Sequence, residues 1–214
     1  NSEQGADATA VGREAGKTSQ GDYTVAVGRY AGYNAQVDDA TAIGHAAGQI
    51  SQSSQATAVG RAAGYEAQAA NATAVGYGAG QTSQGTNATA LGDRAGQVSQ
   101  GTQAVAVGYL AGQSDQGGRG VAVGREAGKI AQTQYATAVG YTAGMTSQGQ
   151  NAVAIGANSG RDSQLAEAVA VGYGAGMTAQ GSASVAVGQT AGQYNQATLS
   201  VAVGREAGQT SQGQ

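Results

Sequence analysis

The sequence predicts an all-β chain that folds as a parallel β-solenoid, or β-roll, built from about thirteen 16-residue coils. Three observations predict this fold. A motif of the form A-V-G-x-x-A-G-x-x-x-Q recurs with a constant 16-residue period along the whole chain, and no copy gains or loses a residue. Small and β-branched residues alternate before the first glycine of each copy. Two glycines per copy would each cost about 1 kcal/mol inside a helix, which argues against a helical repeat.

Each coil begins with a predicted strand, residues 8–11 in the first complete copy. Position 9 is Thr or Val, position 10 is Ala, and position 11 is Val, Ile or Leu in all thirteen copies. Such alternation with β-branched residues is typical of a short strand. A position carries the number of its residue in this first copy, so Gly12 and Gly28 both occupy position 12.

Glycines at positions 12 and 16 mark a predicted turn, because glycine adopts positive φ angles at little steric cost. Residues 17–20 are then expected to form a second short strand, and residues 21–23 to close the coil. Two strands and two turns make one coil, and equivalent positions stack in ladders. The turn glycines of the first three copies are Gly12, Gly16, Gly28, Gly32, Gly44 and Gly48.

Glutamine fills position 20 in every copy and is the strongest polar signal in the chain. Stacked glutamine amides about 4.8 Å apart can hydrogen-bond to one another and fix the register of the coils. A row of amides that binds a ligand is the alternative. The predicted structural ladder comprises Gln20, Gln36, Gln52, Gln68, Gln84, Gln100, Gln116, Gln132, Gln148, Gln164, Gln180 and Gln196, and the pattern extends to Gln4 and Gln212.

The two faces of the first strand predict association between copies. Positions 9 and 11 point to one side and positions 8 and 10 to the other, and both sets are apolar or tiny. The chain has no Phe or Trp, so the core is thin and the burial of one coil contributes little free energy. We therefore expect the alanine-rich face to be a flat outer surface on which another chain packs. The predicted assembly is a homo-oligomer, with a trimer preferred.

A tyrosine strip is the candidate binding surface. Tyrosine recurs at position 13 in every second coil from the fifth to the eleventh copy. The sites between these tyrosines are Asp93, Arg125 and Ala157. An exposed strip of tyrosine and arginine can bind glycans by stacking and hydrogen bonding, whereas the simpler alternative is surface tyrosine on a β-rich stack. The strip consists of Tyr77, Tyr109, Tyr141 and Tyr173.

Composition argues against several classes of function. The net charge of −3 argues against binding to nucleic acid, which usually requires an excess of basic residues. No apolar run is long enough for a membrane span, so we expect no membrane insertion in this segment. With one His and no Cys, we expect no metal site, no cofactor and no Ser/His/Asp triad. The chain is therefore predicted not to be an enzyme.

The whole chain, 1–214, reads as a single repeat array. It begins at Asn1 rather than at Met and carries no polar capping coil, so we interpret it as an uncapped fragment of a longer fibre. Uncapped solenoid ends also invite edge-to-edge pairing. A self-assembling extracellular filament is therefore one alternative function.

The repeat unit resembles known fibre repeats. Copies such as Asn87-Ala88-Thr89-Ala90-Leu91-Gly92 are similar to the N-S-V-A-I-G head repeats of trimeric autotransporter adhesins. They also resemble the A-V-G-Y-x-A-G repeats of bacteriophage and large-virus tail fibres. This resemblance implies a trimeric β-roll that serves as a stiff shaft on a virion tail fibre or a bacterial cell surface. It also implies an extracellular location and a host-surface glycan or receptor as partner.

A second resemblance is to bacterial ice-nucleation proteins, which also use 16-residue repeats with a G-Y-G element such as Gly76-Tyr77-Gly78. It makes an ice-binding solenoid a further alternative. The regular T-x-T ladder of those proteins is missing, however: position 9 is Thr in only six of thirteen copies, so we expect that no flat, uninterrupted Thr array forms.

Overall fold

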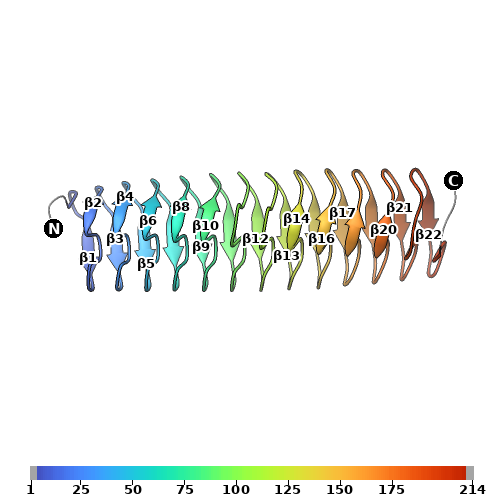
Figure 1. The fold of residues 1–214 in the computed structure, drawn as a ribbon, viewed down its shortest axis with the longest axis horizontal. Helices are drawn as coiled ribbons and strands as arrows, with labels where there is room; N and C mark the ends of the chain where they lie inside the picture. The colour runs from blue at the N-terminus through green and yellow to red at the C-terminus, as the bar shows by residue number, and fades with distance from the viewer. Residues whose placement is uncertain (1–3, 211–214) are drawn as a thin grey trace. The chain divides into compact units, whose positions relative to one another are not determined.

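The computed structural model describes residues 4–210 as an all-β parallel β-solenoid of about 12 turns with about 16 residues per coil. The chain divides into two compact units, Asn1–Ala104 and Val105–Gln214. In both units each coil runs through a first strand, a first turn, a second strand and a second turn. Within a unit the coils stack one upon the next with their strands parallel, as Figure 1 shows.

The first unit contains two parallel sheets, one on each side of the coil. The first strands are β1 (Thr9–Val11), β3 (Val25–Val27), β5 (Thr41–Ile43), β7 (Thr57–Val59), β9 (Thr73–Val75) and β11 (Thr89–Leu91). The second strands are β2 (Thr18–Gln20), β4 (Asn34–Gln36), β6 (Ile50–Gln52), β8 (Glu66–Gln68) and β10 (Thr82–Gln84).

The second unit repeats this arrangement. Its first strands are β12 (Val105–Val107), β13 (Val121–Val123), β15 (Thr137–Val139), β17 (Val153–Ile155), β19 (Val169–Val171), β21 (Val185–Val187) and β22 (Val201–Val203). Its second strands are β14 (Ile130–Gln132), β16 (Thr146–Gln148), β18 (Asp162–Gln164) and β20 (Thr178–Gln180).

Pairing between coils joins equivalent positions of successive repeats. On the first sheet, Ala26 of β3 lies beside Ala42 of β5, and Ala42 beside Ala58 of β7. On the second sheet, Gln36 of β4 lies beside Gln52 of β6. Like residues therefore stack on like, as the invariant period predicts.

The turns are hydrogen-bonded between coils as well. At the first turn, the amide of Gly28 donates to the carbonyl of Val11 at 2.8 Å, and that of Tyr30 donates to Arg13 at 3.0 Å. At the second turn, the amide of Tyr23 donates to Ala6 at 2.8 Å. The backbone ladder thus continues around the coil and satisfies groups that a glycine-rich loop would otherwise leave to water.

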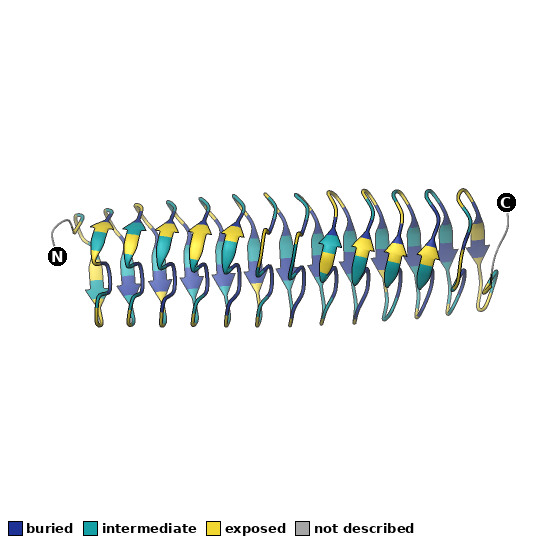
Figure 2. Ribbon diagram, in the orientation of Figure 1, coloured by how far each residue is buried: buried dark blue, intermediate teal, exposed yellow. Residues whose placement is uncertain are grey.

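Alanine and glutamine form the core, and this overturns one expectation. In the coil that begins at Ala40, the side chains of Ala40, Ala42 and Gln52 are fully buried. Positions 9 and 11 point outwards, so that Ile43 is 40% exposed. The prediction of an outer alanine face is therefore wrong. The same alternation of buried and exposed residues recurs from coil to coil within each unit (Figure 2).

The thinness of the coil explains this reversal. A Cβ atom added at Gly48 would lie 3.2 Å from the Cβ atom of Ala42 and 2.6 Å from Oε1 of Gln52. The space between the two sheets therefore accommodates mainly methyl groups and extended amides, and Thr24 at position 8 is a fully buried β-branched residue. Alternation tells which residues share a face, yet it does not tell which face is inside when both are apolar.

Candidate functional site

The glutamine ladder lies inside both units. Nε2 of Gln52 donates to the carbonyl of Thr41 at 2.8 Å and to Oε1 of Gln68 at 3.1 Å. Amide-to-amide bonds of this kind link consecutive ladder glutamines from Gln36 to Gln100 in the first unit and from Gln116 to Gln180 in the second. The tandem repeat therefore builds the predicted ladder.

The ladder weakens at Gln20 and Gln196. The bond from Gln20 to Gln36 is 3.5 Å long, and the buried Oε1 atoms of Gln20 and Gln196 have no donor among the described residues. Gln4 is exposed, and Gln212 lies outside the described residues. All twelve ladder glutamines from Gln20 to Gln196 are no more than 3% exposed, so they bind one another and the backbone rather than an external ligand.

The six predicted turn glycines all have positive φ angles. Position 12 allows close stacking: Gly44 has φ 128°, and a Cβ atom there would lie 2.6 Å from the carbonyl oxygen of Gly60. Position 16 makes room for the ladder: Gly48 has φ 50°, and a Cβ atom there would collide with the amide of Gln52. The first glycine thus permits contact between coils, and the second permits contact between turn and core.

The predicted tyrosine strip lies at the first turn, and its four rings are 42% to 58% exposed. Tyr77 belongs to the first unit, where the guanidinium carbons of Arg61 and Arg94 lie 5.7 and 5.5 Å from its ring centroid. In the second unit, Arg125 lies 5.6 Å from the ring of Tyr109 and 5.7 Å from that of Tyr141. Tyr173 has no arginine stacked on it among the described residues.

A denser group of aromatic and basic side chains lies at the first turn of the first unit. Tyr30 packs edge-on against Tyr33, with centroids 5.7 Å apart, and against His45, with centroids 6.3 Å apart. The guanidinium of Arg29 stacks on the ring of Tyr30 at 4.9 Å. We call this group the edge patch; it comprises Arg29, Tyr30, Tyr33, His45, Arg61 and Tyr77.

Most of the edge patch escaped prediction because its residues differ in type along position 13 and extend to positions 14 and 17. Arg29 and His45 are at position 13, Tyr30 is at position 14 and Tyr33 is at position 17. A search for tyrosine along position 13 finds Tyr77, but it passes over Arg29, His45 and Arg61 at the same position and misses Tyr30 and Tyr33 at positions 14 and 17. The signal that could have revealed them is the solenoid itself, because positions 13, 14 and 17 of one turn stack beside the same positions of the next.

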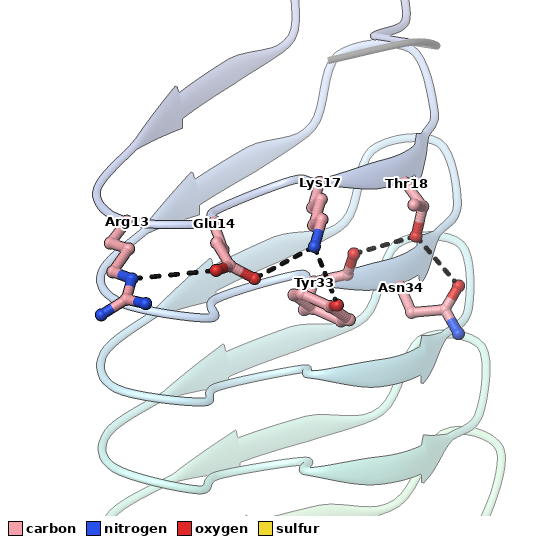
Figure 3. A network of polar contacts seen from close by, with 6 residues as sticks. All are labelled: Arg13, Glu14, Lys17, Thr18, Tyr33 and Asn34. Carbon is pink, nitrogen blue, oxygen red and sulfur yellow. Dashed lines mark hydrogen bonds and ion pairs between the residues drawn. The ribbon is translucent and has the colours of Figure 1, made fainter.

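Charged residues at other first turns form local networks. In Figure 3, Glu14 lies between Arg13 at 3.7 Å and Lys17 at 3.2 Å, and Lys17 Nζ also donates to the hydroxyl of Tyr33 at 3.2 Å. The hydrogen bond to Tyr33, followed by the hydrogen bond and the charge of Glu14, raises the pKa of Lys17 above its ordinary value. The motif R-E-A-G-K recurs from Arg125 to Lys129 with the same two ion pairs.

The second turns of the first unit are acidic. Together they carry Asp7, Asp22, Asp38 and Asp39 and no basic residue. Two of these carboxylates bind backbone between coils: Asp22 Oδ1 accepts from the amide of Ala6 at 2.7 Å, and Asp38 Oδ1 from that of Asp22 at 3.0 Å. Within residues 4–210, no group of three or more His, Cys, Asp or Glu residues could hold a metal ion.

The outer face of the first sheet differs between the two units. In the first unit, Thr occupies position 9 in four consecutive coils, at Thr41, Thr57, Thr73 and Thr89, beside an aliphatic residue at position 11. In the second unit, thirteen of the fourteen residues at positions 9 and 11 are Val or Ile, the exception being Thr137. The second unit therefore presents an aliphatic face, and we keep this name for it.

Comparison with known proteins gives no relative for this chain: no family model matches it, and neither does any curated protein sequence. None of the described residues forms a helix that is long and apolar enough to cross a membrane. The fold is therefore shown by the structure alone, and the function is argued from its surfaces.

Proposed function

We propose that this chain is a structural segment of an extracellular fibre, a shaft with adhesive surfaces on a phage tail fibre or a cell-surface adhesin. It has no catalytic role in this proposal. The observation that carries the proposal is the aliphatic face of the second unit, which points away from the core of its own coil. Ile155 is 41% exposed on it, and Val201 and Val203 are 60% and 65% exposed.

A flat apolar sheet face of this kind favours association. Burial of apolar surface contributes about 25 cal/mol per Å², and contiguous apolar patches on soluble proteins mark sites of protein contact. The face repeats along the stack, so a second copy in the same register meets Val with Val at each coil. The partner is therefore a copy of this chain, and a trimer is the assembly favoured by the resemblance to fibre repeats.

The mass of the assembly tests the proposal. Light scattering of the full chain is expected to give the mass of three chains. A double variant, Val139→Lys and Val171→Lys, places two charges on the aliphatic face and should yield single chains with unchanged circular dichroism. Both side chains point outwards, so the variant leaves the core of the coil intact.

Ile130→Lys is the matched control. Ile130 is 44% exposed on the second strand β14, on the other side of the coil, and the change of chemistry is the same. The control is expected to remain trimeric. A wild-type chain that is a single chain at micromolar concentration would contradict the proposal, as would a trimer that survives the double variant.

Ice binding is the second candidate, and the threonine row of the first unit favours it. Thr41, Thr57, Thr73 and Thr89 point outwards on one sheet, with neighbours about 4.8 Å apart along the stack. Regular hydroxyl and methyl groups on a flat face could order water. Thermal hysteresis and ice shaping by the wild-type chain, lost in Thr57→Lys, would support this function. A wild-type chain that shows neither thermal hysteresis nor ice shaping would contradict the ice-binding function.

A further inference from the structure

We infer that the edge patch of the first unit binds an anionic polysaccharide in which charged and neutral sugars alternate. This inference rests on the adhesive part of the proposed function and names the ligand class. The saccharide chain would run along the stack, across the coils that contain Arg29, His45 and Arg61. Three features of the patch carry the inference: unpaired charge, charge spacing and ring geometry.

The charge of the patch is available to a ligand. Seven arginines lie at the first turns of the chain, and five of them pair with a carboxylate within the ion-pair distance. Arg29 and Arg61 are the two without such a pair in the part of the chain that the structure describes. Both are exposed. An arginine that has no internal counter-ion can pair with a carboxylate or sulfate through two parallel hydrogen bonds.

The spacing of these charges matches an alternating polysaccharide. Arg29 and Arg61 occupy the same repeat position two coils apart, which corresponds to about 10 Å along a parallel sheet. A polymer with one carboxylate per disaccharide places its charges about one disaccharide apart, which is a comparable distance. His45 lies at the same position in the coil between them and is also exposed.

The rings of the patch are held in place for stacking. The edge-on contacts of Tyr30 with Tyr33 and His45 fix three rings relative to one another. The ring of Tyr77 lies 5.7 Å from the guanidinium of Arg61 and is 44% exposed. Sugar rings present C–H groups to aromatic faces, while the neighbouring guanidinium groups reach the acidic substituents.

Nucleic acid fits these features less well. Each strand of a DNA duplex carries a phosphate about every 3.4 Å, so a bound strand would need far more cations than the patch supplies. The chain as a whole carries a net charge of −3, and the second turn of the same unit bears Asp7, Asp22, Asp38 and Asp39. Glu66, exposed on β8 of the same unit, adds a further negative charge.

Binding of defined oligosaccharides to the full chain tests the inference. The probes are a hyaluronan octasaccharide, a neutral chitin oligosaccharide of the same length and a single-stranded oligothymidine, each titrated by calorimetry. We expect binding of the hyaluronan fragment that weakens as salt rises, and no binding of the neutral probe. Equal binding of the neutral probe, or tighter binding of oligothymidine, would overturn the inference.

Variants locate the site. The double variant Arg29→Gln and Arg61→Gln is expected to lower the affinity at least about tenfold, because each guanidinium loses a charge-assisted bond. Arg205→Gln is the matched control, since Arg205 has the same repeat position in the second unit and pairs with Glu206 at 3.2 Å. Tyr77→Ser should weaken binding, whereas Tyr173→Ser, at the same repeat position, should not. An unchanged affinity in both patch variants would refute the site.

The two proposals fail separately. Light scattering of the Arg29→Gln and Arg61→Gln variant should still give the mass of three chains, and the charged variant of the aliphatic face should still bind the hyaluronan fragment. If the arginine variant loses binding but stays trimeric, the result supports the edge patch and says nothing about the trimer. If the wild-type chain is a single chain that binds the hyaluronan fragment, the fibre proposal fails and the edge patch stands.

Discussion

At the scale of single residues, the stability of the coil depends on amides that no solvent reaches. Gln148 of β16 donates to the carbonyl of Thr137 at 2.8 Å and to Oε1 of Gln164 at 3.2 Å, and it accepts from Nε2 of Gln132 at 3.0 Å. Its removal would leave the buried Oε1 atom of Gln164 without its donor and would take one acceptor from Nε2 of Gln132, which also donates to the carbonyls of Val121 and Ala136. A buried group that loses its partner costs roughly 1–3 kcal/mol, so single ladder positions matter.

We therefore expect Gln148→Ala to lower the free energy of unfolding by about 3 kcal/mol, the sum of a cavity and of lost amide bonds. Urea denaturation followed by circular dichroism measures it. Gln150→Ala, two residues away at an exposed position, is the control and should change stability by less than about 0.5 kcal/mol. Equal effects of the two changes would contradict the structural role of the ladder.

In the first turn that contains Gly60 and Ala62, both residues have positive φ angles, but substitutions at the two positions should have opposite effects on stability. Gly60 has φ 127°, and a Cβ atom there would lie 2.8 Å from the carbonyl carbon of Gly76, so Gly60→Ala should cost at least about 3 kcal/mol. Ala62, in the same turn, has φ 56°, a conformation that costs a non-glycine residue about 1 kcal/mol. Ala62→Gly should therefore leave stability unchanged or raise it slightly. Thermal unfolding of the two variants, compared with the wild type, tests this opposite pair.

At the scale of elements, the first strand has an inside of alanine and an outside of β-branched residues. Ala138 of β15 is fully buried, whereas Val139 is half-buried with its side chain on the outer face. Larger apolar residues usually form the core of a protein, but here they lie outside and alanine lies inside, because the two sheets are so close together. Size, rather than hydrophobicity, decides which residue is inside.

This reversal predicts that the larger residue is tolerated only on the outside. Ala138→Val should destabilise the chain by about 2 kcal/mol or more through overpacking. Val139→Ala should cost less than about 1 kcal/mol in a single chain, since little of its surface is buried there. Chemical denaturation of both variants in a Val171→Lys, Val187→Lys background gives the comparison, because this background charges the same face and removes association without changing residue 139. A larger cost for Val139→Ala would mean that the aliphatic face is the core.

The elements themselves could be predicted from the sequence because every repeat position carries its own constraint. Glycines at positions 12 and 16 mark the first turn, and β-branched residues at positions 9 and 11 mark the first strand. The direction of the strand faces could not be predicted, since both are apolar. The edge patch was not predicted either, because the contacts of Tyr30 with Tyr33 and with His45 depend on the path of the coil.

At the scale of the whole molecule, each unit is a stack in which a coil touches only the coils before and after it. In such arrays the stability is approximately a sum of coil terms and terms for neighbouring interfaces. The hydrogen bonds at both turns join equivalent positions of successive coils, so the stack has one register.

Deletion of residues 57–72, one complete coil, should therefore preserve the fold. The shortened chain is expected to keep its β-sheet circular dichroism spectrum. The slope of its unfolding free energy against denaturant concentration should be smaller, because one coil less of buried surface is exposed on unfolding. Deletion of residues 57–64 removes half a coil and would bring second strands against first strands. That chain should fail to fold, and a native-like spectrum from it would contradict the stacked register.

The amide column in each unit has a direction. In each of its bonds Nε2 of one glutamine donates to Oε1 of the equivalent glutamine in the next coil, so the side-chain dipoles all point the same way. Two oxygens of the column, Oε1 of Gln20 and Oε1 of Gln196, are buried without a donor among the described residues. Nε2 of Gln196 donates to the carbonyls of Val185 and Ser200, so both of its N–H groups have acceptors. The column fixes the sense in which coils stack, because a coil with its glutamine amide reversed would place oxygen against oxygen.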